Sequence, residues 1–278
     1  MEPPLRAAVG RLISRPLAPG DQAAVLSLIE ADRLPGQPPP HPRMLARLGT
    51  ADLDRMSVTV LTEPNGRVAG ALCCAARMSD DARVICWMHG HENFGVLTAL
   101  IALARSTVGH QRLVLLGTDS DQLGDPHVLG VPVLARRITA RALRTARFTP
   151  VSSYRFFKHD LKGSVPPPTF PLAEISPLGD PAWKRIQLVD GRGNVWAWAL
   201  MYSAGPDHLV LRYLDFNKSR RGRRMGVHLL NQCLHYAIKR GADSLVSYAE
   251  TDDHERAALL FCNGFIQHDT IVSYESPH

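Results

Sequence analysis

The densest cluster of charged side chains in this sequence lies between Lys218 and Arg224, where five of seven residues are basic. An apolar, β-rich segment at 208–216 precedes the cluster, and a helical pattern follows it. The first backbone N–H groups of a helix have no partner within the helix, and the helix dipole favours negative charge there. We therefore expect a short basic, glycine-containing loop that binds phosphate at a helix start.

The elements around this loop follow from residue spacing. Val227, Leu230, Leu234 and Ile238 recur at the period of a helix, which Gly241 should end. Further along the chain we expect a strand at 244–251, a helix at 253–262 and a last strand at 267–274.

The order of strand, basic loop and helix resembles the GNAT superfamily of acyltransferases, whose central motif is Arg/Gln-x-x-Gly-x-Gly/Ala. The matching run is 221–226, in which Arg221 and Gly226 agree with the motif. In that family the loop amides hold the pyrophosphate of acetyl-CoA, and a backbone N–H of the preceding strand binds the thioester carbonyl. The resemblance implies that the donor is acetyl-CoA or another acyl-CoA, and that it is bound by Phe216 (through its N–H), Arg220, Arg221, Gly222, Arg223, Arg224, Gly226 and Val227.

Two departures from the family pattern bear on the chemistry. Arg224 stands where the family has the first glycine, so either it contacts a phosphate itself or the ligand is not CoA. The family also carries Ala-x-x-Leu-Tyr-x-x-x-Gly-Phe, whose tyrosine protonates the leaving thiolate. Counting back from Gly264 places Leu260 at that position, or Phe261 if one residue is deleted. Neither side chain can donate a proton, so the usual general acid is missing.

Three residues near the expected strand ends are candidates for proton transfer. Glu250 closes the strand 244–251, and His254 follows it with an imidazole, a side chain that commonly serves as a general acid or base. Tyr213 could take the place of the missing tyrosine. Each has a plainer interpretation, because a helix start is rich in polar residues and a tyrosine within a strand commonly packs on the sheet.

A second set of the same elements occurs earlier in the chain. Hairpin signals at Asn65-Gly66 and Asp190-Gly191 are each followed by a strand, a helix and another strand. We therefore predict an α/β fold with a mixed sheet, made of two tandem GNAT-like units packed together. The loop of the first unit, 89–93, contains no arginine, so we expect it to be degenerate for CoA binding and to serve a structural role or the acceptor pocket. Its His89, His91 and Glu92 match no strong metal-site spacing, and no metal is predicted.

The proline-rich segment 161–171 marks the expected boundary between the two units. The predicted division is 1–160 for the N-terminal unit, 161–171 for the linker and 172–278 for the C-terminal unit.

Bulk composition narrows the class of protein. The net charge of +6 suits an anionic ligand, and the absence of an 18-residue apolar run argues against a membrane span. Five cysteines without Cys-x-x-Cys spacing, and an N-terminus without a continuous apolar stretch, favour reduced thiols and a cytoplasmic location.

Three hypotheses about function follow. The first is an N-acyltransferase that moves an acyl group from acyl-CoA to an amine of a small molecule or peptide. The second keeps the fold but takes the acyl group from aminoacyl-tRNA, as Arg224 and the missing tyrosine would permit. The third is a non-catalytic ligand-binding protein on a GNAT-like scaffold. All three leave the oligomeric state open.

Overall fold

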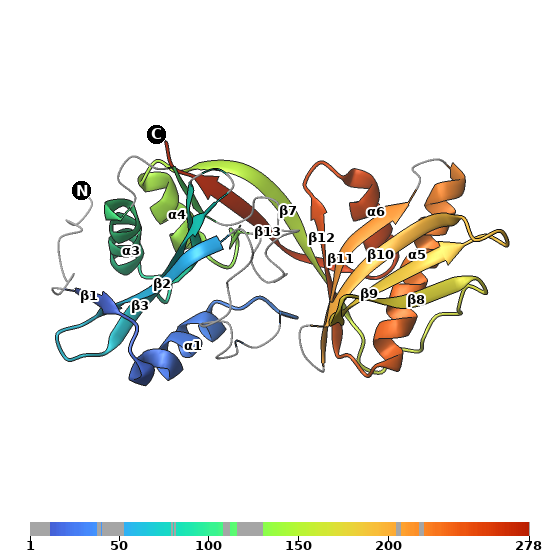
Figure 1. Ribbon diagram of the computed structural model, residues 1–278, viewed down its shortest axis with the longest axis horizontal. Coiled ribbons are helices and arrows are strands. Elements are labelled where there is room, and N and C mark those ends of the chain that lie inside the picture. Colours follow the sequence, from blue (N-terminus) through green and yellow to red (C-terminus); the bar gives the residue numbers. More distant parts are fainter. Residues whose placement is uncertain are drawn as a thin grey trace, which may run out of the picture. The chain divides into compact units, whose positions relative to one another are not determined.

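The computed structural model describes residues 12–37, 40, 53–78, 80, 82–107, 112–115, 130–203, 207–216 and 220–277. The chain divides into two compact units. Unit 1 takes its residues from Met1–Arg33, Pro39–Ser153 and Ile271–His278, and unit 2 from Leu34–Pro38 and Tyr154–Thr270. Each unit combines a sheet with helices (Figure 1), which confirms the predicted α/β architecture.

Unit 1 is built on strands in the order β1-β2-β3-β4-β5-β13. Neighbours from β1 to β4 are antiparallel, whereas β4 and β5 are parallel. Side chains alternate between the two faces of β3, so Cys73 packs with helix α1 while Leu72 packs with helices α3 and α4. The elements that lie wholly within unit 1 are β1 (Ile13–Pro16), η1 (Pro19–Asp21), α1 (Gln22–Ala31), β2 (Leu53–Thr62), β3 (Val68–Arg77), β4 (Ala82–His89), α3 (Phe94–Ser106), β5 (Leu113–Leu115), β6 (Val131–Pro132) and α4 (Arg137–Thr145).

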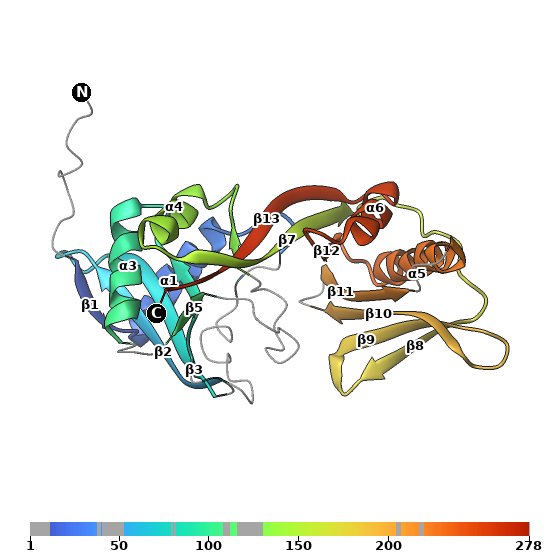
Figure 2. The same ribbon diagram turned by 90° about the horizontal axis from the view of Figure 1, so that it is seen from above.

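Unit 2 repeats this plan with strands in the order β7-β12-β11-β10-β9-β8. The pair β11 and β12 is parallel, and the remaining neighbours are antiparallel. Helices α5 and α6 share one core with the sheet, through side chains such as Leu230 and Leu260, and lie on the same side of it in Figure 2. The elements that lie wholly within unit 2 are β8 (Ala173–Leu178), β9 (Asp180–Val189), β10 (Val195–Ser203), β11 (His208–Phe216), α5 (Arg220–Lys239), β12 (Ser244–Glu250) and α6 (His254–Cys262).

Both predicted hairpins form. The β2–β3 turn places Gly66 at φ 85° and the β9–β10 turn places Gly193 at φ 80°. Both values lie in the left-handed region that glycine adopts without steric cost.

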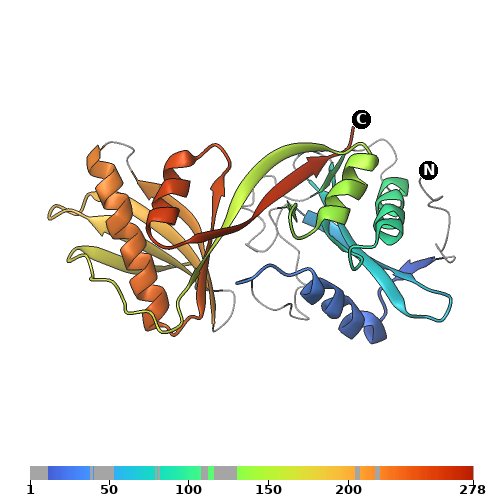
Figure 3. The ribbon, with the colours of Figure 1, turned by 180° about the vertical axis from the view of Figure 1, so that it is seen from behind.

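Two long strands contribute to both units, and Figure 3 shows them in yellow-green and red. Strand β7 (Thr149–Asp160) begins in unit 1, and its residues from Tyr154 onward pair with β12 in unit 2. Strand β13 (Ile266–Glu275) begins in unit 2, and its end pairs with β5 and β6 in unit 1. The strands of unit 1 are therefore completed by the end of β13, and those of unit 2 by a strand that begins in unit 1.

This exchange differs from the contiguous division at 161–171 that the sequence led us to expect. The last eight residues belong to unit 1, and Tyr154–Asp160 belong to unit 2. The segment 161–171 is also part of unit 2 and lies along α5. There His235 Nδ1 is 2.9 Å from the carbonyl oxygen of Pro167, and the rings of Phe170 and His228 are 5.3 Å apart.

Candidate active site

The basic segment of unit 2 is more helical than the sequence suggested. We expected a short basic loop before the helix, but α5 already begins at Arg220. The correction has a simple cause, because arginine is a good helix former and only the two glycines favoured a loop. The N–H groups without a helical partner therefore belong to Arg220, Arg221, Gly222 and Arg223, the first turn of α5.

The next residues of α5 divide between solvent and core. Arg224 and Val227 are exposed, whereas Met225 packs against the core of unit 2. Gly226 is buried directly beneath the ring of Phe216, since a Cβ placed there would lie 3.0 to 3.2 Å from three ring carbons. This glycine is therefore required for the close approach of α5 to β11.

Strands β11 and β12 separate toward their carboxyl ends. Their parallel register runs from His208↔Ser244 to Leu211↔Ser247, although β11 continues to Phe216 and β12 to Glu250. Beyond this point β11 pairs only with β10 and β12 only with β7. The described strands thus open a wedge between them on the side where α5 and α6 begin.

A β-bulge marks the start of the wedge. Tyr213 faces Leu200 and Leu211 faces Met201, so Arg212 is the extra residue of β11. Unit 1 has the same feature, because Cys86 is the extra residue between Ile85 and Trp87 of β4. Bulges disrupt the local ladder and are common beside functional sites. Phe216 is in register with Ala197 of β10. Binding of the thioester carbonyl by its N–H stays a prediction.

The three candidates for proton transfer lie around this wedge. Glu250 is exposed at the end of β12, and His254 is exposed at the start of α6 with Nδ1 3.3 Å from a guanidinium nitrogen of Arg155. Tyr213 stacks on Trp198, with ring centroids 4.9 Å apart, and remains 44% exposed. The exposed ring leaves Tyr213 accessible to a ligand.

Sequence reasoning missed Arg256, which lies between these candidates. Its guanidinium donates a hydrogen bond of 3.3 Å to the carbonyl oxygen of the bulge residue Arg212. Its Nε is buried and has no hydrogen-bond partner among the described residues. Burial lowers the pKa of Arg256 to about 10, against the opposing charges of Asp253 and Glu250. The sequence did hold a signal, because counting back from Gly264 puts Arg256 at the alanine of the family motif.

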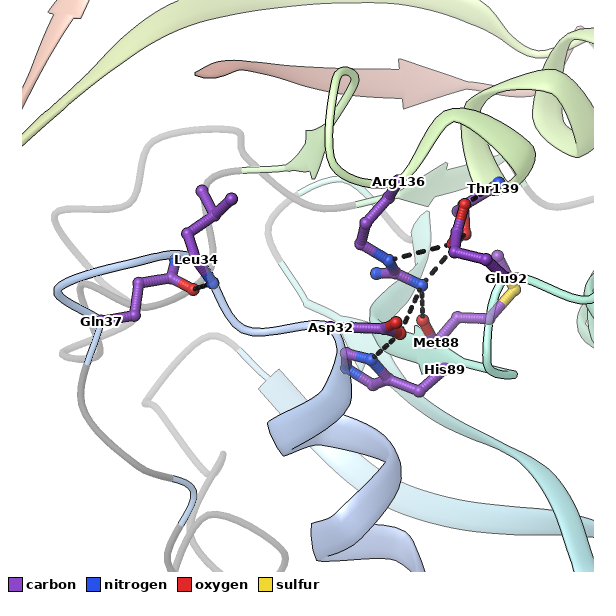
Figure 4. Close-up of polar contacts among 8 residues, drawn as sticks. All are labelled: Asp32, Leu34, Gln37, Met88, His89, Glu92, Arg136 and Thr139. Atoms are coloured by element: carbon purple, nitrogen blue, oxygen red, sulfur yellow. Dashed lines mark hydrogen bonds and ion pairs between the residues drawn. The ribbon is translucent and has the colours of Figure 1, made fainter. Parts of the chain in front are cut away.

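Unit 1 fills the equivalent region with its own charged side chains, as Figure 4 shows. His89 at the end of β4 has Nδ1 2.7 Å from Oδ2 of Asp32, which follows α1. The guanidinium of Arg136 lies 3.2 Å from the same carboxylate and donates a 2.6 Å hydrogen bond to the carbonyl oxygen of Met88. All of these side chains are largely buried.

Glu92 closes the other side of this network. Its Oε2 accepts hydrogen bonds from the backbone N–H groups of Ile138 (2.7 Å) and Thr139 (3.0 Å), in the first turn of α4. Its Oε1 accepts from the hydroxyl of Thr139 and lies 3.4 Å from Nε of Arg136. Unit 1 therefore places its own carboxylate at a helix start, the kind of position that favours an anion.

The pKa values in this network are shifted for identifiable reasons. Burial would raise the pKa of Asp32, but the hydrogen bond with His89 and the charge of Arg136 leave it below the usual value. Burial and the charge of Arg136 lower the pKa of His89 to about 4, although Asp32 opposes this. At neutral pH, Asp32 is thus ionised and accepts the Nδ1–H of a neutral His89.

Comparison with known proteins identifies the fold. Residues 162–265 match the model of the acetyltransferase (GNAT) family. No curated protein is similar to the chain in sequence. Among solved structures, a GCN5-related N-acetyltransferase from Sphaerobacter thermophilus has a TM-score of 0.68 at 14% identity, covering 96% of this chain and 95% of its own.

Two further structures support the same assignment. A tandem GNAT protein from the clavulanic acid biosynthesis pathway has a TM-score of 0.66 at 16% identity, covering 96% of this chain and 98% of its own. An acetyltransferase of the GNAT family from Colwellia psychrerythraea has a TM-score of 0.56 at 12% identity, covering 95% and 100%. Residues 162–265 therefore match a GNAT-family domain, and nearly the whole chain has the fold of GNAT proteins, consistent with two tandem units.

Three features of the described residues bear on the remaining expectations. The five cysteines are all free, and four of them are buried. No group of three or more histidine, cysteine or carboxylate side chains in the described ranges is arranged to hold a metal ion. No described helix is both long enough and apolar enough to cross a membrane.

Proposed function

We propose that this protein is an N-acyltransferase that moves an acyl group from acetyl-CoA or another acyl-CoA to an amine of a small molecule or peptide. One observation carries the proposal. The domain that matches the acetyltransferase family is also the unit in which β11 and β12 separate beside an arginine-rich helix start. The wedge suits the extended arm of the donor, and the N–H groups at Arg220–Arg223 suit its pyrophosphate.

Acyl transfer from a thioester to an amine depends mainly on positioning the two reactants and polarising the carbonyl. The bulge at Arg212 interrupts the regular ladder of β11 beside the wedge, a feature that is common beside functional sites and supports placing the reacting carbonyl near this part of the strand. The nitrogen of the amine forms a bond to the carbonyl carbon, the carbon–sulfur bond breaks, and the amine gives up a proton. We assign the removal of that proton to Glu250 or His254, which flank the wedge.

We further propose that only unit 2 binds the donor. In unit 1 the carboxylate of Glu92 occupies the N–H groups at the start of α4, and Asp32 and Arg136 fill the space beside β4. A second anion would have to displace this buried network. Titration calorimetry with acetyl-CoA should therefore show one binding site per chain, and two equivalent sites would contradict this part of the proposal.

Donor binding tests the assigned site directly. Arg221→Ala and Arg224→Ala should each weaken acetyl-CoA binding by roughly tenfold or more, because each removes a charged contact to phosphate. Arg240→Ala is the matched control, since Arg240 is an exposed arginine just after the opposite end of α5. Unchanged affinity in both site variants would refute the assigned site.

Turnover tests the reaction. Labelled acetyl-CoA and a panel of primary amines should give saturable formation of a labelled amide. If the protein binds neither acetyl-CoA nor CoA, but binds aminoacyl-tRNA with a steep salt dependence, the donor would instead be charged tRNA. Binding of acetyl-CoA without transfer to any amine would favour the non-catalytic hypothesis.

A further inference from the structure

The wedge of unit 2 contains a positively charged side chain at a position where the family motif has an alanine. Arg256 lies in the first turn of α6, where Asp253 caps the helix by accepting a hydrogen bond from the N–H of Arg256. Its side chain reaches β11 and donates to the carbonyl oxygen of Arg212, the residue at which the two parallel strands have just separated. A guanidinium therefore lies at the opening of the wedge.

The environment of Arg256 is costly for a cation. A buried guanidinium N–H without a partner loses the hydrogen bond that it makes with water. Nε of Arg256 is such a group, because it is buried and has no hydrogen-bond partner among the described residues. The family motif has an alanine at this place, which carries no such cost. The lowered pKa of about 10 still leaves the group charged at neutral pH. A half-buried cation whose buried Nε has unused hydrogen-bonding capacity suits an anion that is present only during turnover.

The position of Arg256 along α6 indicates which anion this is. Leu260 occupies the place of the missing tyrosine and is fully buried in the core, so it contributes no proton. Arg256 lies four residues earlier, which is one helical turn away on the same face. The only group of the proposed reaction that gains negative charge and remains charged is the leaving sulfur.

We propose that Arg256 stabilises the thiolate leaving group of the acyl donor, in place of the tyrosine that protonates it elsewhere in the family. This inference rests on the proposed acyl transfer in unit 2. The amine nitrogen forms the new bond to the carbonyl carbon, and the carbon–sulfur bond breaks with its electron pair on sulfur. Arg256 keeps its proton and pairs with the sulfur through a charge-assisted hydrogen bond. The proton of the amine passes to the base, and the thiolate takes a proton from water after release.

Leaving-group dependence separates this role from a structural one. The experiment compares acetyl-CoA, whose alkyl thiolate is a poor leaving group, with an acetyl thioester of an acidic aryl thiol, whose thiolate is already stable. Arg256→Met should lower kcat with acetyl-CoA by roughly 10²-fold, in the range known for loss of one preorganised donor. With the aryl thioester the loss should be only a few-fold. Arg256→Lys should recover part of the activity with acetyl-CoA, because it restores the charge but not the planar geometry.

Two controls make the outcome decisive. Arg192→Met changes an exposed arginine in the β9–β10 turn and should leave both rates unchanged. Thermal unfolding and calorimetric CoA binding of Arg256→Met show whether the variant is folded and still binds the donor. Equal losses with the two thioesters would overturn the role of Arg256 while leaving the proposed function intact. A wild-type protein that is inert with every thioester would overturn both.

Discussion

His89 shows how a single buried side chain makes stability depend on pH. Its pKa is about 4 in the folded protein, below the ordinary value of 6.5. Between these values the unfolded chain binds a proton that the folded chain does not, so stability is complete above about pH 6.5 and falls as the pH drops toward 4. The full effect is at most about 3 kcal/mol.

The variant His89→Asn should remove this dependence, since asparagine can still donate to Asp32 but does not titrate. Hydrogen exchange of β4, measured at several urea concentrations between pH 7 and pH 4.5, reports the stability of unit 1. His228→Asn is the control, because His228 is exposed in unit 2 and lies outside the network. If the stability of His89→Asn depends on pH as steeply as that of the wild type, a group other than His89 causes the dependence.

At the scale of elements, the contact between α5 and β11 depends on one missing side chain. Gly226→Ala adds a methyl group 3.0 to 3.2 Å from the ring of Phe216, so the ring or the helix must shift. Overpacking of this kind costs about 1–3 kcal/mol, of which the higher helix propensity of alanine recovers up to about 1 kcal/mol. We expect a lower midpoint in urea unfolding and weaker donor binding.

Gly191→Ala provides the comparison for this variant. Gly191 lies in the β9–β10 turn with open space around its Cα, and its φ is not positive. The variant Gly191→Ala should have the wild-type midpoint in urea unfolding and bind the donor with wild-type affinity. Equal behaviour of the two variants would show that Gly226 is not needed for close packing.

The elements were largely predictable because their signals are local. Turn residues such as Asn65-Gly66 specify hairpins, and the stripe from Leu230 to Ile238 specifies an amphipathic helix. The start of α5 was not predictable, because glycine in a helix is normally unfavourable and the packing of Gly226 on Phe216 is a tertiary effect. The role of Arg256 required the separation of β11 and β12, which no local pattern encodes.

At the scale of the whole molecule, the last residues of the chain complete the first unit. Ile271 and Tyr274 are buried, and β13 pairs there with β5 and β6. A chain that ends at Thr270 should therefore leave β5 without its neighbour. We expect faster hydrogen exchange in β4 and β5, or loss of soluble protein. Removal of only the last two residues is the control, because β13 ends at Glu275, and a Thr270 truncation with wild-type exchange would contradict the pairing.

The partners of β7 and β13 could not be predicted from sequence, since alternating apolar residues specify a strand but not the strand beside it. Their exchange has a consequence for how the protein is made. During translation the N-terminal residues emerge first, and domains usually fold in that order. Here unit 1 lacks its final strand until residues 271–275 have been synthesised, after the whole of unit 2, so the unit whose synthesis begins first is the last that can finish folding.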